Sequence, residues 1–149
     1  MRARAIETMD GRRTIAIVLD AGEEVVDVLL GFARQENLSG AYFTAIGALR
    51  NVTLGFWEAE VREYRRIPLQ EQVEVLSLAG NVASGPDGMP KIHAHIVVGK
   101  VDGTAHGGHL LQAHVHPTLE IMLVEVSGKL RRRFDARTGL PLLDPSAPE

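Results

Sequence analysis

Cysteine is absent from the 149 residues of the chain. This absence excludes disulfide bonds, thiolate metal ligands and a thiol nucleophile, so a transition-metal site would have to use histidine, aspartate or glutamate. A chain without cysteine also fits a reducing compartment, and we therefore expect a cytoplasmic protein.

Long apolar runs are missing as well. No stretch approaches the roughly 18 apolar residues that a membrane-spanning helix needs. The N-terminal residues 1–7 form no apolar core of a secretory signal, and Asp10 follows soon after them. We therefore expect no membrane segment and no membrane partner.

An excess of positive charge is the third missing feature. Lysine and arginine together number 16 against 19 acidic residues, which gives a formal net charge of −3. Proteins that depend on phosphate contacts are usually basic overall. The basic runs at Arg62–Arg66 and Arg131–Arg133 are typical of solvated strands rather than of one compact patch. DNA is therefore a possible partner, but the composition does not favour it.

The residues that are present describe an ordinary globular protein. Hydrophobic residues make up 45% of the chain and charged residues 23%. The length suits one domain, which we assign to residues 1–143. Residues 144–149 lack apolar anchors, and we expect them to form a flexible tail.

Hydrophobic periodicity predicts one early helix among many strands. Residues 14–19 read as a strand, and a helix follows from Glu23 with Val25, Leu29 and Phe32 on its apolar face. Asn37 is predicted to end this helix. Further strands are predicted at 42–46, 52–61, 73–83, 92–101, 110–115, 119–126 and 130–134. Hairpin-length connections after residue 50 favour an α+β fold, a mostly antiparallel sheet packed with one main early helix.

All six histidines lie between His93 and His116, and three of them form the candidate site. Side chains alternate across a strand, so His93 and His95 share the face opposite to Ala94, about 6.6 Å apart along the strand. Two imidazoles at this spacing can reach one cation. His109 returns beside them after the turn signal Asp102-Gly103, which predicts a three-histidine metal site.

The register of this hairpin decides whether His109 can take part. A two-residue loop at Asp102-Gly103 would place residue 110 opposite His95 and turn His109 away. A bulge at Gly107-Gly108 would shift the register by one residue and turn His109 toward His93 and His95, and a longer loop would do the same. We take the bulge as the explanation for the paired glycines.

Three imidazoles with a fourth position open are typical of catalytic zinc sites. Zinc is therefore the predicted cofactor, although imidazole also suits nickel, copper and iron. The alternative is that these histidines lie on a solvent-exposed strand and bind nothing. Glu120 could orient a histidine, act as a general base for a metal-bound water, or form a salt bridge. His106, His114 and His116 are more typical of polar positions near strand ends.

Several runs in this chain are similar to one known family, the plants-and-prokaryotes-conserved (PPC) domain. They are 73–82 (VEVLSLAGNV), 91–95 (KIHAH), 102–103 (DG), 107–110 (GGHL) and 118–120 (TLE), and the similarity also covers 22–26, 46–49 and 138–140. The resemblance spans nearly the whole chain. It implies a homotrimer in which His93, His95 and His109 form a metal site near the subunit contacts.

The family occurs behind AT-hooks in plant nuclear DNA-binding proteins, whereas bacterial members stand alone. An AT-hook needs an Arg-Gly-Arg-Pro core, and the nearest match here, residues 11–14, has no proline. We therefore expect a standalone, trimeric, metal-binding module with a regulatory or ligand-binding role. The alternatives are a metal-dependent enzyme acting on a small molecule, and a DNA-binding protein without an AT-hook.

Overall fold

The computed structural model describes residues 1–146. Its strands are β1 (Arg2–Met9), β2 (Arg12–Asp20), β3 (Gly40–Glu58), β4 (Glu63–Leu69), β5 (Val73–Ser84), β6 (Pro90–Gly99), β7 (Ala105–Glu125), β8 (Arg132–Asp135) and β9 (Leu140–Leu143). One helix, α1 (Val25–Gln35), follows β2. The predicted fold, a mostly antiparallel sheet with a single helix, is confirmed.

Helix α1 begins and ends where its sequence provides caps. The Glu24 carboxylate accepts a hydrogen bond from the backbone N–H of Asp27 at 2.7 Å, which satisfies one free donor of the first turn. The second oxygen of Glu24 accepts the N–H of Ala113 on β7 at 2.9 Å and so ties the helix to the sheet. Asn37 follows the helix with a φ of 53°, the left-handed conformation that commonly ends helices.

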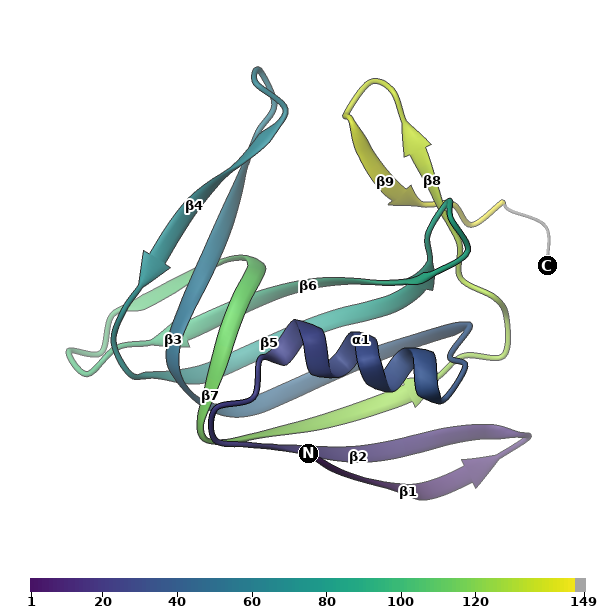
Figure 1. Cartoon of the computed structure of the whole chain (residues 1–149), viewed down its shortest axis with the longest axis horizontal. Helices are drawn as coiled ribbons and strands as arrows, with labels where there is room; N and C mark the ends of the chain where they lie inside the picture. The colour runs from purple at the N-terminus through teal and green to yellow at the C-terminus, as the bar shows by residue number, and fades with distance from the viewer. Residues whose placement is uncertain (147–149) are drawn as a thin grey trace.

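The main sheet has the strand order β1-β2-β7-β6-β5-β3-β4, with every neighbouring pair antiparallel. An additional pairing of β7 with β3 closes the strands β7, β6, β5 and β3 into a ring. Helix α1 contacts β6 and β7, and buried side chains such as Phe43, Leu78 and Ile96 fill the space between the layers (Figure 1).

Two hairpins extend from the same side of this body. Figure 1 shows the β3–β4 hairpin and the β8–β9 hairpin rising on the side opposite to β1 and β2, with β6 running below them. Strands β8 and β9 form a separate two-stranded sheet. Strand β6 carries His93 and His95, so the two hairpins flank the predicted metal site.

Two predicted breaks do not end strands. Strand β3 runs through Gly47, which stands at a register shift with a φ of 147°. A Cβ at that position would lie 2.4 Å from the carbonyl oxygen of Thr118, so the glycine permits a close strand approach. Strand β7 likewise runs through Pro117, beyond which its pairing passes to β2. Glycine and proline predict turns in a sequence. The sequence does not show that a neighbouring strand packs against the backbone at these two residues, so the prediction ended the strands there.

Strands β1, β4 and β9 were not predicted. Strand β1 is exposed along its whole length, and most of β4 is exposed, so neither shows a clear alternation of buried and exposed residues.

Of the predicted C-terminal tail, residues 147–149 lie outside the described part of the chain. Asp144 donates its N–H to the carbonyl of Arg131 at 2.9 Å and pairs with Arg133 at 3.2 Å. None of the described residues forms a helix long and apolar enough to cross a membrane.

Candidate metal centre

The structure brings the three predicted histidines together. His93, His95 and His109 each offer a ring nitrogen, and these three atoms lie within 4.8 Å of one another. The ring centroids are 5.2 Å apart for His93 and His95, 5.2 Å for His93 and His109, and 5.4 Å for His95 and His109. The imidazoles from two adjacent strands therefore face one point.

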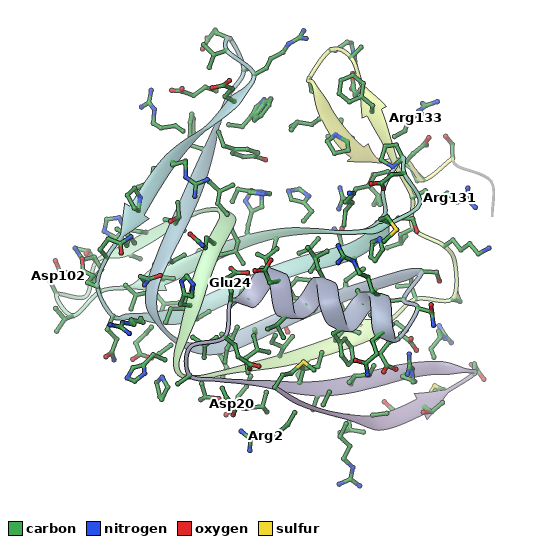
Figure 2. The ribbon with its side chains drawn as sticks, in the orientation of Figure 1. Arg2, Asp20, Glu24, Asp102, Arg131 and Arg133 are labelled. Carbon is green, nitrogen blue, oxygen red and sulfur yellow. The ribbon has the colours of Figure 1, made fainter. Side chains whose placement is uncertain are left out.

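The turn between β6 and β7 sets this convergence. Lys100 donates its N–H to the carbonyl of Thr104 at 2.9 Å, which leaves the three-residue loop 101–103. Gly103 adopts a φ of 80°, and Asp102 accepts the N–H of Thr104 at 2.9 Å. Figure 2 shows Asp102 at the tip of this turn. A loop of three residues rather than two places His109 opposite His95, on the same face of the sheet.

The predicted bulge at Gly107-Gly108 is wrong, because the β6–β7 ladder is regular from Gly99 to His95. The three-residue loop, and not a bulge, turns His109 to the same face as His93 and His95. The paired glycines serve a different purpose: a Cβ on Gly108 would lie 2.9 Å from the carbonyl oxygen of Gly55 on β3. They let β7 lie close to a strand on each side.

A bulge does occur in this part of β7, one step further along the chain. Thr53 pairs with Gln112 and Leu54 with Leu110, so Leu111 has no partner in the β3–β7 ladder. The bulge places Gly55 opposite His109.

Tyr64 is a member of the site that the sequence did not reveal. Its ring stacks on the His109 ring with a centroid distance of 4.6 Å and an interplanar angle of 22°. Tyr64 reaches His109 across Gly55, where a Cβ would lie 2.8 Å from the Tyr64 ring. Trp57 contacts the Tyr64 ring edge-on, with a centroid distance of 5.0 Å and an interplanar angle of 64°. Since β4 was not predicted, no pattern connected Tyr64 to the histidines.

The environment favours the neutral forms of His93 and His109 by lowering the pKa of each. Burial lowers the pKa of His109 to about 4, and the nearby charges of His93, His95 and Arg132 act in the same direction. Burial also lowers the pKa of His93, with smaller contributions from Arg132 and His95. Neutral imidazoles have a free lone pair, which is the form that binds metal. The buried His109 Nδ1 has no hydrogen-bond partner among the described residues.

A cavity of about 400 Å³ opens beside the histidines. His93 and His109 line it together with Tyr64 from β4 and Leu140–Leu143 from β9, so both projecting hairpins form its walls. Arg132 also lines the cavity and is 7% exposed. A metal ion held by the histidines would therefore adjoin a space large enough for a small molecule.

The other candidate residues lie apart from this cluster. Glu120 is exposed on β7 and pairs with Val18 on β2 and Ile46 on β3. Among the described residues, the ligand atoms that gather within 4.8 Å of one another come from His93, His95 and His109, and this group does not include Glu120. His114 bonds to the Asn51 side chain at 2.9 Å, His116 is exposed, and His106 pairs with Val98.

A family sequence model and several solved structures are similar to this chain. The sequence model of the Plants and Prokaryotes Conserved (PCC) domain matches residues 6–127. No curated protein sequence matches the chain.

Solved structures from several organisms resemble it. A plant- and prokaryote-conserved (PPC) protein from Pyrococcus horikoshii is 35% identical with a TM-score of 0.84, over 91% of this chain and 93% of that one. A metal-containing protein from Archaeoglobus fulgidus is 37% identical with a TM-score of 0.79, over 86% and 90%. A candidate DNA-binding protein from Ralstonia eutropha JMP134 is 29% identical with a TM-score of 0.82, over 87% and 90%. On this evidence, the chain belongs to the Plants and Prokaryotes Conserved (PCC) domain family.

Proposed function

We propose that His93, His95 and His109 bind one divalent metal ion, with zinc as the expected ion. One distance carries this proposal: the Nε2 atoms of His93 and His95 are 3.3 Å apart. Two nitrogens at a zinc bond length of about 2.0–2.1 Å and a tetrahedral angle are separated by about 3.3–3.4 Å. The unpartnered Nδ1 of His109 and the metal content of the Archaeoglobus fulgidus relative support the same proposal.

The proposed role of the metal is to bind a small-molecule ligand. Three histidines leave at least one coordination position for a further ligand. The adjoining cavity of about 400 Å³ would admit such a ligand, whereas a closed structural zinc site has no open position. The protein would act as a ligand-binding or regulatory module in the cytoplasm.

Metal analysis of protein purified without a histidine tag tests this proposal. We expect about one metal ion per chain, and we expect the double variant His93→Ala, His95→Ala to lose it. The matched control is His116→Ala, which removes an exposed imidazole outside the cluster and should keep the metal. Equal metal content in all three proteins would contradict the assignment.

We also propose a homotrimer, as the resemblance implies. Tyr42, Ile46 and Met122 are 53%, 61% and 42% exposed. They lie on the neighbouring strands β3 and β7, where Met122 pairs with Thr44, the residue midway between Tyr42 and Ile46. Apolar side chains gathered in this way mark an interaction surface. Sedimentation analysis should give three chains per particle, and Ile46→Arg should produce monomers. Val61→Arg, at an equally exposed residue outside both strands, is the control.

An enzyme with Glu120 as general base is the alternative role. Glu120 is not among the described residues whose ligand atoms gather at the histidines. This role would need Glu120, from the same subunit or a neighbouring one, to reach a metal-bound water. DNA binding remains the third candidate because of the named Ralstonia relative, and a mobility-shift titration at several salt concentrations would test it.

A further inference from the structure

Arg132 differs from its two neighbours in the basic run. Arg131 and Arg133 are exposed, and Figure 2 shows both side chains on the side of β8 away from the β3–β4 hairpin. Arg132 lies between them on the opposite face and is only 7% exposed. Arg132 lines the same cavity as His93 and His109.

The buried guanidinium has only neutral partners. Its two Nη atoms donate to the Asn81 side-chain oxygen and, at 3.3 Å, to the carbonyl of Pro141. Its Nε is buried without a hydrogen-bond partner among the described residues. No carboxylate of residues 1–146 forms an ion pair with Arg132. The nearby acids pair with other arginines, Asp144 with Arg133 and Asp135 with Arg137.

An unpaired buried cation is unfavourable in the folded protein unless something compensates its charge. Burial lowers the pKa of Arg132, and no carboxylate opposes this effect. Two of the five N–H donors of the guanidinium are used, so donors remain for an anion. A carboxylate is the group that arginine binds with two parallel hydrogen bonds.

The remaining walls of the cavity are mostly apolar. Ile92 from β6 and the β9 residues Leu140–Leu143 face it, and Lys91, its second cation, is already paired with Asp87 at 2.8 Å. Apolar walls with one convergent charged group are typical of sites for small organic molecules. An inorganic anion would leave those walls without a contact.

We propose that this cavity binds a small organic carboxylate, whose oxygens accept hydrogen bonds from Arg132 and reach the metal at the histidines, and whose apolar body packs on β9. The proposal rests on the proposed metal site and extends it to a ligand class. The hairpin that supplies Arg132 and β9 lies beyond residue 127, where the family match ends. This ligand preference is therefore a property of the C-terminal hairpin.

Calorimetric titration of the zinc-loaded full chain tests the proposal with hexanoate as the probe and hexanamide as its uncharged counterpart. We expect hexanoate to bind at least about 10-fold more tightly than hexanamide, because it gains charge-assisted hydrogen bonds. Arg132→Met should weaken hexanoate at least about 10-fold and leave hexanamide unchanged. Arg131→Met, at the exposed neighbour, is the matched control and should bind hexanoate normally.

Three results would overturn the proposal: equal affinity for hexanoate and hexanamide, no binding of hexanoate, or unchanged binding by Arg132→Met. Inorganic phosphate that binds more tightly than hexanoate would also overturn it. If Arg132→Met does not fold, the comparison of hexanoate with hexanamide on the unchanged chain decides. If the chain takes up no metal, the proposed function fails, and the same comparison on the metal-free chain still tests the Arg132 subsite.

Discussion

The half-buried position of His109 and its lowered pKa predict how the stability of the metal-free protein depends on pH. The pKa of His109 falls from 6.5 to about 4 in the folded chain because burial disfavours its charged form. In the unfolded chain this imidazole regains an ordinary pKa of about 6.5. Below that pH the unfolded state binds the proton more readily than the folded state, so acid favours unfolding.

The size of this effect follows from the two pKa values. Stabilisation by the neutral imidazole is present above pH 6.5 and is lost as the pH falls toward 4. One pKa unit corresponds to about 1.4 kcal/mol, so between pH 7 and pH 5 the loss amounts to about 2 kcal/mol. His109→Phe retains a ring against Tyr64 and removes the titrating group, and it should lose about 2 kcal/mol less over this range.

Urea unfolding in the presence of a chelator measures this difference. The wild-type chain and His109→Phe are each unfolded at pH 7 and pH 5, and the change in the free energy of unfolding is compared between them. His116→Phe, which replaces an exposed imidazole, should lose as much stability as the wild type. Equal losses in the wild type and His109→Phe would refute the reasoning, because the charge of His109 would then be equally tolerated in both states.

Three further predictions follow from other contacts. Glu24→Ala should lower the free energy of unfolding by about 1–2 kcal/mol, since it leaves two backbone donors without their carboxylate, and urea titration would measure this loss. Gly103→Val should destabilise the chain by about 1–2 kcal/mol, because a β-branched residue is disfavoured at a φ of 80°, and thermal unfolding with Gly128→Ala as control would detect it. Cobalt(II) titration should quench the fluorescence of Trp57, the single tryptophan, since Trp57 contacts Tyr64 and Tyr64 stacks on His109, and His109→Ala should weaken this quenching.

Short-range sequence patterns were sufficient to predict the features that depend on neighbouring residues alone. Helix α1 was predicted because its apolar residues recur at the helical period and Asn37 can end it. The alternation in β6 was enough to place His93 and His95 on one face, opposite to the buried Ala94 and Ile96. Each of these features depends on residues within a few positions of one another.

The sequence by itself determined the fold class, the early helix and the pairing of two histidines on one strand face. Only the tertiary structure decided that a three-residue loop, and not a bulge at Gly107-Gly108, turns His109 toward them. It also brought Tyr64 and Arg132 to the site, from strands 45 residues before and 23 residues after His109. Strand register and the meeting of distant segments depend on packing across the whole domain, and periodicity within one strand holds no information about either.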